Sequence, residues 1–220
     1  MESAGTRNLV FSSSAAVYGA TQGSGITEDA PTEPINAYGA TKLIGEWMVR
    51  DAAAATGIAA TCLRYFNVAG AGSPELGDLA VLNLVPMVFE RIDRGAAPRV
   101  FGADYPTPDG TCVRDFVHVL DVAEAHVAAA DALVGAPSGS RVYNVGTGVG
   151  SSVLEMIDAI ARASGVELTP ELEPRRAGDP ADVVASASRI HDELGWRATR
   201  SLDEIATSAW AAWRSHHHAE

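Results

Sequence analysis

The chain has 220 residues, enough for one large domain or two small ones, and its composition, 47% hydrophobic and 20% charged, is ordinary for a globular protein. Its net charge of −12 disfavours nucleic acid and anionic membrane surfaces as partners, and no apolar run reaches the ~18 residues that a membrane helix needs. No secretion signal is visible, and Cys62 and Cys112 are the only cysteines. We therefore expect two reduced thiols in a cytoplasmic protein, and no metal site.

The first part of the chain has the pattern of a parallel β-α-β unit. The expected elements are a buried strand at 8–19 that opens into small polar residues, a loop at 20–36, a helix at 36–57 and a second buried strand at 58–68. Helical periodicity places Leu43, Trp47, Met48 and Val49 on the apolar side of the helix, and Gly57 is expected to end it.

The remainder alternates short elements with turn-rich loops. The expected elements are a loop at 69–81, a helix at 83–95, a strand at 99–102, a loop leading into a strand-like stretch at 104–119, a helix at 120–135, a strand at 141–146, and helices at 151–164 and 201–214. The last two helices frame an irregular segment that contains Arg175, Arg176 and Asp179.

Glycines at 146, 148 and 150 lie between a strand and an amphipathic helix, nearly as in a dinucleotide-binding turn. The fingerprint requires G-x-G-x-x-G in the first β-α-β unit and an acidic residue about 20 positions later. Here the last glycine comes one position early, and a proline-interrupted stretch follows the helix. We interpret this segment, and the glycines at 19, 23 and 25, as turns.

Tyr38 and Lys42 are four residues apart in the expected helix, so their side chains share one face. A phenol ordinarily has a pKa near 10, and a role as base at neutral pH requires a value about 3 lower, or roughly 4 kcal/mol. An ammonium group one turn away favours the phenolate and supplies part of this. Lysine and arginine together number 16, and Lys42 is the only lysine.

Hydroxyl side chains end the first expected strand, in "SSSAAVYG" at 12–19. The carboxyl ends of parallel strands line the ligand crevice of an α/β sheet. A serine there could share a proton with Tyr38 and with a substrate hydroxyl. Together with "RYFN" at 64–67, these residues form a more specific arrangement than the Tyr-Lys pair alone.

Several stretches carry a resemblance to a known family. They are "NLVFSSSAAVYG", "AYGATK", "LRYFNVAGA", "VFGADYPTPDGTCVRDFVHVLDVAEAHV", "YNVGTGVGSSVLEMI", "PRRAGD" and "LGW". The chain resembles the extended short-chain dehydrogenase/reductases of the NAD-dependent epimerase/dehydratase type, and more narrowly the UDP-glucose 4-epimerases, over essentially its whole length.

The resemblance implies an α/β fold: the C-terminal part of a Rossmann-like doubly wound parallel sheet plus a small α/β substrate-binding domain. Residues 1–68, with 118–146 returning to it, would form the remnant of the NAD-binding domain, and 69–117 with 147–220 the UDP-sugar-binding domain. In this family the glycine fingerprint and four strands precede the strand at 8–14. We therefore expect a chain truncated at its N-terminus by roughly a hundred residues, with an unpaired sheet edge and doubtful activity of its own.

The resemblance also implies an activity: bound NAD removes hydride from C4 of a UDP-hexose and returns it to the opposite face. Tyr38 would be the acid/base, Lys42 its electrostatic partner, and Ser14 the hydroxyl that polarises the C4–O bond. The implied cofactor-binding residues are Ser12, Tyr38, Lys42 and Tyr65. The implied substrate-binding residues are Ser14, Asn67, Asn83, Phe101, Arg114, Arg176 and Asp179. A homodimer through helices that include the one carrying Tyr38 is also implied.

Other functions remain open. A 4,6-dehydratase would need an acid and a base beside the strand-end serine, where this chain has Ala15 and Ala16. Epimerases of UDP-glucuronate or UDP-N-acetylhexosamines differ mainly in pocket volume, and Val183 replaces a tyrosine common in the family. Arg114 could instead pair with Asp115 or Asp121. The chain could also be an inactive or merely UDP-sugar-binding fragment.

Overall fold

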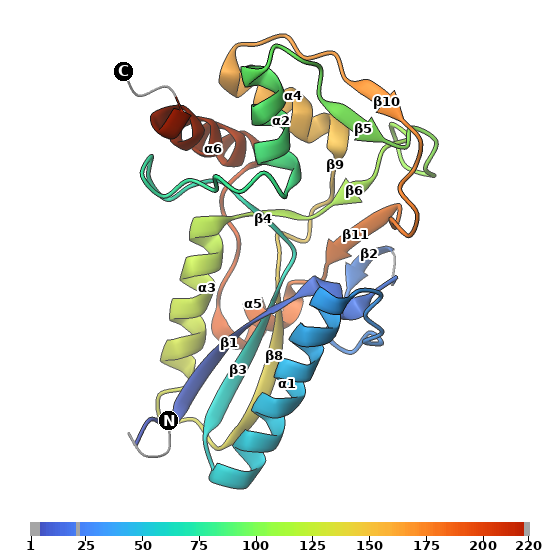
Figure 1. Ribbon diagram of the computed structural model, residues 1–220. Helices are drawn as coiled ribbons and strands as arrows, with labels where there is room; N and C mark the ends of the chain where they lie inside the picture. Colours follow the sequence, from blue (N-terminus) through green and yellow to red (C-terminus); the bar gives the residue numbers. More distant parts are fainter. Residues whose placement is uncertain (1–4, 21–22, 218–220) are drawn as a thin grey trace.

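The computed structural model describes residues 5–20 and 23–217 and shows an α/β protein in which a sheet region and a helical region lie end to end (Figure 1). The strands are β1 (Asn8–Ser14), β2 (Gly23–Ile26), β3 (Ala59–Tyr65), β4 (Asn67–Ala69), β5 (Arg99–Phe101), β6 (Val113–Arg114), β7 (Phe116–His118), β8 (Gly139–Val145), β9 (Ser151–Ser152), β10 (Glu171–Glu173) and β11 (Asp182–Ala185). The helices are α1 (Ala37–Thr56), α2 (Leu84–Asp93), α3 (Val119–Ala132), α4 (Val153–Ser164), α5 (Ser188–Leu194), α6 (Leu202–His217) and the 3₁₀ helix η2 (Ala15–Tyr18).

The sheet region is built on β1, β3 and β8, which pair in parallel in the order β1-β3-β8. Helix α1 covers one face of this sheet, and α3 and α5 cover the other (Figure 1). Every residue of β3 but the last is buried, as expected for a central parallel strand. The register aligns Ser14 with Tyr65 and Tyr65 with Val145, so the strands end at a common edge. The predicted Rossmann-like parallel sheet is confirmed.

The helical region packs α2, α4 and α6 around an apolar cluster, with the strand pair β5-β10 beside it. Helix α4 begins with a capping box, in which the Ser152 side chain accepts from Glu155 N and the Glu155 side chain accepts from Ser152 N. The largest buried side chains of the cluster are Phe89, Phe116, Met156, Ile157, Ile160, Ile205 and Trp213.

Several short elements differ from those expected. Residues 15–18 form η2 rather than a continuation of β1, because the Ser14 hydroxyl caps it by accepting from Ala16 N. Strands β2, β10 and β11 and helix α5 were not predicted. Strand β11 lies between β2 and β6, and β6 pairs with β9, so this sheet joins segments far apart in the sequence.

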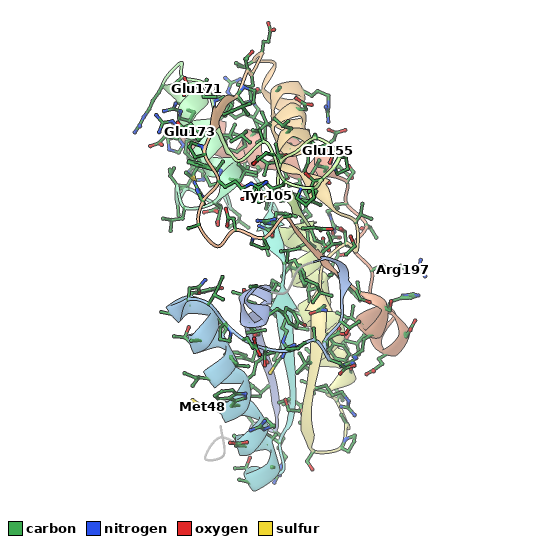
Figure 2. The ribbon with its side chains drawn as sticks, turned by 90° about the vertical axis from the view of Figure 1, so that its right-hand side faces the viewer. Met48, Tyr105, Glu155, Glu171, Glu173 and Arg197 are labelled. Carbon is green, nitrogen blue, oxygen red and sulfur yellow. The ribbon has the colours of Figure 1, made fainter. Side chains whose placement is uncertain are left out.

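The apolar side of α1 was predicted correctly for Leu43 and Val49 and wrongly for Trp47 and Met48. Leu43, Val49 and Ala53 are buried, but Trp47 is 48% exposed and Met48 is 68% exposed. Figure 2 shows Met48 pointing away from the sheet. The buried stripe instead includes the charged residue Glu46, which is taken up below.

The expected division into two domains differs from the packing at 188–198. Ile190 of α5 and Trp196 belong to the apolar cluster formed with β8 and α3, so this part of 147–220 lies against the sheet region. Cys62 and Cys112 are buried free thiols, and burial raises the pKa of Cys62 to about 11. In the ranges described, none of the helices is both long enough and apolar enough to cross a bilayer.

Candidate active site

Helix α1 places Tyr38 and Lys42 beside the end of β1. Its first turn is capped by Asn36, whose side chain accepts from Gly39 N at 2.8 Å. A Cβ at Gly39 would lie 2.4 Å from the carbonyl oxygen of Ala16, so glycine is needed for this close approach of α1 and η2. Lys42 Nζ lies 5.6 Å from the centre of the Tyr38 ring and donates to the carbonyl oxygen of Ser12 at 2.9 Å. The two side chains therefore share a face, as predicted.

The end of β1 opens onto a cavity of about 350 Å³, which we call the tyrosine cavity. Its walls come from the carboxyl ends of β1 and β3, the first turn of α1, the segment after β3 and the start of α2. The predicted site residues that line it are Ser14, Tyr38, Tyr65, Asn67 and Asn83. The structure thus brings Ser14 and Tyr38 together around one space, whereas Lys42 does not line this cavity and lies beside the Tyr38 ring.

Tyr65 is held at the edge of this cavity by two polar side chains. Its hydroxyl lies 2.8 Å from Ser12 Oγ and 2.6 Å from His126 Nε2. His126 Nδ1 lies 2.8 Å from the carbonyl oxygen of Val122, which can only accept, so Nδ1 donates there, while the single phenol proton of Tyr65 is donated to Ser12 Oγ. Burial raises the pKa of Tyr65, which keeps the phenol protonated as a donor. His126 was not predicted, because a single histidine in an apolar helix has no distinguishing pattern.

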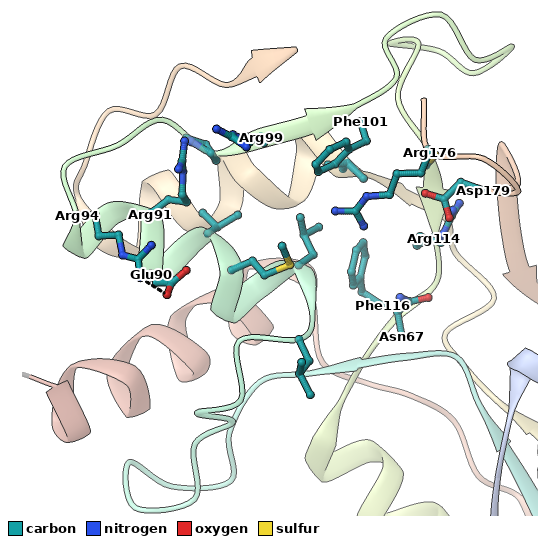
Figure 3. Close-up of a pocket in the computed structure, with 17 residues that line it drawn as sticks. Asn67, Glu90, Arg91, Arg94, Arg99, Phe101, Arg114, Phe116, Arg176 and Asp179 are labelled. Atoms are coloured by element: carbon teal, nitrogen blue, oxygen red, sulfur yellow. Dashed lines mark hydrogen bonds and ion pairs between the residues drawn. The ribbon is translucent and has the colours of Figure 1, made fainter. Parts of the chain in front are cut away.

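A second cavity of about 410 Å³, the arginine cavity, lies between α2, β5, β6 and the segment before β11 (Figure 3). The Arg176 guanidinium stacks 3.8 Å from the centre of the Phe101 ring. The predicted site residues that line it are Asn67, Phe101, Arg114, Arg176 and Asp179. The two cavities have Asn67, Leu84 and Phe116 in common, so they adjoin along one wall.

Arg114 is directed by its own strand rather than by an acidic partner. Its Nη1 donates to the carbonyl oxygen of Val113 at 2.8 Å. In the part of the chain that the structure describes, Asp121 pairs with Arg200 at 2.5 Å, and Asp115 accepts from backbone amides. The alternative pairing of Arg114 with either aspartate is therefore not seen.

The arginines that line the arginine cavity differ in whether they are paired with a carboxylate. At one end Arg94 is paired with Glu90 at 2.7 Å, while at the other Arg176 and Arg114 lie beside Asp179 (Figure 3). Arginines directed into a concave space present forked N–H donors that suit a diphosphate. Apolar contacts from Phe116 and Met87 complete the walls and were not predicted.

The glycine turn at 146–150 does not fit a bound pyrophosphate. The amides of Thr147 and Gly148 donate to the Asp115 carboxylate at 2.7 and 3.0 Å, so the donors that would hold a phosphate are already used. Burial raises the pKa of Asp115, and these hydrogen bonds oppose that change. The interpretation of this segment as a structural turn therefore has a physical basis.

The family model for the "NAD dependent epimerase/dehydratase family" matches residues 1–146. A UDP-glucose 4-epimerase of Corynebacterium glutamicum is 45% identical over 96% of this chain, which spans 64% of that relative's length. A UDP-glucose 4-epimerase structure from Stenotrophomonas maltophila, with bound NAD and formylated UDP-arabinopyranose, is 41% identical and superposes with a TM-score of 0.92 over 100% of this chain and 67% of its own. A UDP-Glc/GlcNAc 4-epimerase structure from Campylobacter jejuni is 40% identical, with a TM-score of 0.79 over 96% of this chain and 66% of its own.

Proposed function

Because the chain belongs to the NAD dependent epimerase/dehydratase family, we propose that it binds a UDP-hexose and interconverts UDP-glucose and UDP-galactose at C4, with NAD as cofactor. One observation carries this proposal. The tyrosine cavity, with Ser14 and Tyr38, adjoins the arginine cavity along the wall that contains Asn67. A ligand with a diphosphate at one end and a sugar at the other matches this arrangement.

The arginine cavity would hold the uridine diphosphate. Arg114 and Arg176 donate to the diphosphate oxygens, and Asp179 accepts from ribose hydroxyls. The Phe101 ring fixes the plane of the Arg176 guanidinium, so less freedom is lost when the arginine binds. Asn67 and Asn83 then direct the hexose toward the tyrosine cavity.

The tyrosine cavity would carry the proton transfer. The Tyr38 phenolate oxygen takes the proton of the C4 hydroxyl and later returns it, and the Lys42 ammonium stabilises the phenolate. Ser14 Oγ hydrogen-bonds the same substrate oxygen. When bound, NAD would accept the hydride from C4 and give it back.

The residues around Lys42 fit one end of the cofactor. Ser12, Tyr38, Lys42 and Tyr65 lie together at the carboxyl ends of β1 and β3, where the nicotinamide ribose would meet the sugar. Lys42 has its amine at the surface of this edge and could donate to ribose hydroxyls. We assign these four residues to the nicotinamide riboside.

A second candidate is UDP-sugar binding without turnover. The arginine cavity is built from residues 67–179 of this chain and needs no cofactor to form. For the sugar itself, Val183 packs into the cluster around Val17 and Tyr18 instead of presenting a ring to the hexose. UDP-N-acetylhexosamine and UDP-glucuronate are the alternative substrates.

Two further assignments belong to this proposal. The exposed apolar side chains of Ile44, Trp47 and Met48 on α1 support a homodimer that pairs this helix with a second copy. The two free buried thiols support a reducing compartment, the cytoplasm. Light scattering of the purified chain tests whether it is a homodimer.

The experiment that tests the function supplies NAD with UDP-galactose, UDP-N-acetylgalactosamine or UDP-glucuronate and measures the 4-epimer formed. We expect conversion of UDP-galactose to UDP-glucose. Conversion of UDP-glucuronate alone would overturn the substrate assignment. Calorimetric binding of UDP without any conversion would favour the second candidate.

A further inference from the structure

A buried ion pair joins α1 to β3 and lines neither cavity. Glu46 of α1 and Arg64 of β3 form a two-pronged pair, Nη2 to Oε2 at 2.6 Å and Nε to Oε1 at 2.9 Å. The Ser13 hydroxyl of β1 also donates to Glu46 Oε1, at 2.5 Å. Exposure is 6% for Glu46, 5% for Arg64 and 1% for Ser13.

Stability alone gives little reason for such a pair. Removing two charges from water costs several kcal/mol each, and replacing a buried pair with apolar side chains of similar size is often neutral or stabilising. The rest of the buried stripe of α1, Gly39, Leu43, Val49 and Ala53, is apolar, whereas the groups that meet the pair from other elements are polar. The ion pair adds a fixed orientation. A planar guanidinium and a carboxylate form their two hydrogen bonds in only one relative geometry, whereas apolar contacts are not directional.

Glu46, Arg64 and Ser13 each lie within one helical turn or one residue of a proposed site residue. Ser13 lies between Ser12 and Ser14 on β1, and Arg64 directly precedes Tyr65 on β3. Glu46 follows Lys42 by one turn of α1. The three contacts therefore join the three elements from which the reacting side chains project.

The pair is itself fixed by a fourth element. Arg64 Nη1 donates to the Tyr18 hydroxyl at 2.9 Å and to the carbonyl oxygen of Glu28 at 3.2 Å. The Tyr18 hydroxyl donates in turn to Asn144 Oδ1 of β8 at 2.6 Å. Burial lowers the pKa of Arg64, but the hydrogen bonds to Glu46 and Tyr18 outweigh it and leave the pKa raised, so Arg64 stays charged.

We propose that Glu46 and Arg64 are positioning residues, which with Ser13 fix α1 against β1 and β3 so that Tyr38 and Lys42 face Ser14; this role in catalysis rests on the proposed function. Neither residue lines the tyrosine cavity or the arginine cavity. Their effect on the reaction passes through the placement of the Tyr38 phenol and the Lys42 amine. A shift of about 1 Å in such groups costs roughly a hundredfold in rate.

The test uses Lys42 as a reporter, because it is the only lysine in the chain. In protein labelled with ¹⁵N and ¹³C in lysine, the side-chain NMR signals of Lys42 report whether its amine still bonds to the carbonyl oxygen of Ser12. The main variant is Glu46→Leu/Arg64→Met, which removes both charges and leaves neither one buried alone. Circular dichroism and thermal unfolding show whether it is folded.

A milder variant and a matched control keep the result decisive. Ser13→Ala removes only the hydroxyl that donates to Glu46. Tyr143→Phe is the control, because it also removes one buried hydroxyl that donates to a carboxylate, that of Glu193 at 2.6 Å, on β8 away from α1.

We expect the Lys42 signals to move toward those of free lysine in the double variant, to move less in Ser13→Ala, and to stay unchanged in Tyr143→Phe. We also expect turnover in the double variant to fall roughly a hundredfold with the affinity for UDP unchanged. Unmoved Lys42 signals in a folded double variant would overturn the proposal. If that variant does not fold, unmoved signals in Ser13→Ala would overturn it. A wild-type chain without turnover would contradict the proposed function, and the Lys42 signals would still decide this inference.

Discussion

The tyrosine cavity and the arginine cavity adjoin but are held in place by different means. Ser14, Tyr38 and Tyr65 of the tyrosine cavity lie on β1, α1 and β3, long regular elements joined by a buried ion pair. Phe101, Arg114 and Arg176 of the arginine cavity lie on β5, β6 and the irregular segment after β10, beside an apolar cluster that includes α2. Directional contacts thus support the groups that would transfer a proton, while apolar packing supports the groups that would bind a diphosphate.

This difference suits the work proposed for each cavity. Proton transfer requires donor and acceptor to be placed within a few tenths of an ångström, whereas charge attraction to a diphosphate tolerates small movements. The comparison therefore separates two kinds of variant. Changes in the tyrosine cavity should act on turnover, and changes in the arginine cavity should act on affinity.

The largest expected effect comes from the reacting pair. Tyr38→Phe and Lys42→Met should each lower turnover of UDP-galactose, supplied with NAD, by roughly a hundredfold to ten-thousandfold, because proton transfer loses its base or the charge that stabilises it. Calorimetric affinity for UDP should stay within a few-fold of wild type, since both residues lie outside the arginine cavity. A large loss of UDP binding in either variant would contradict the separation of roles.

The next largest effect should be on binding. Arg176→Ala should weaken UDP binding roughly tenfold to a hundredfold, the usual cost of losing a hydrogen bond between charged groups. Arg94→Ala is the matched control, because this arginine lines the same cavity but is paired with Glu90. Titration calorimetry with UDP measures both, and equal losses in the two variants would mean that overall charge, rather than the Arg176 site, governs affinity.

A smaller effect should follow from the ring beneath Arg176. Phe101→Leu keeps an apolar wall but removes a cation–π contact worth about 0.5–1 kcal/mol, so UDP affinity should fall only about twofold to fivefold. The same titrations measure this. A loss as large as that of Arg176→Ala would assign the binding energy to the ring instead of the charge.

The smallest effect concerns a contact between the sheet region and helix α6 of the helical region. His118 Nε2 lies 2.9 Å from Ser208 Oγ of α6, and burial lowers the pKa of His118. The unfolded chain therefore binds a proton more readily, so stability present above a pH of about 6.5 is lost as the pH falls. Guanidinium unfolding between pH 7.5 and 5 should show a steeper loss in the wild type than in His118→Gln, and parallel losses would show that His118 is not responsible.

The sequence predicts the tyrosine cavity better than the arginine cavity, for a physical reason. Tyr38 and Lys42 lie on one helix, where a spacing of four residues determines that they share a face. Phe101, Arg114 and Arg176 come from separate segments, so only the family resemblance indicated them and the fold had to bring them together. Strands β2, β10 and β11 escaped prediction because two- to four-residue pairings depend on distant partners.

Buried charged residues were the feature that the sequence predicted least well. A glutamate such as Glu46 is typical of the exposed face of a helix. Its neighbours Trp47 and Met48 were therefore assigned to the core, but Glu46 is the buried residue. Its burial depends on Arg64, a partner on another element that periodicity does not identify.

The most direct test of the central claim is an NMR titration of the ¹³C-tyrosine-labelled chain with UDP and with UDP-galactose. Signals of Tyr38 and Tyr65 are identified by their absence in Tyr38→Phe and Tyr65→Phe. We predict that saturating UDP-galactose moves both signals and that saturating UDP, confined to the arginine cavity, leaves them in place. Equal movement by both ligands, or none by either at saturation, would contradict a single ligand spanning the two cavities.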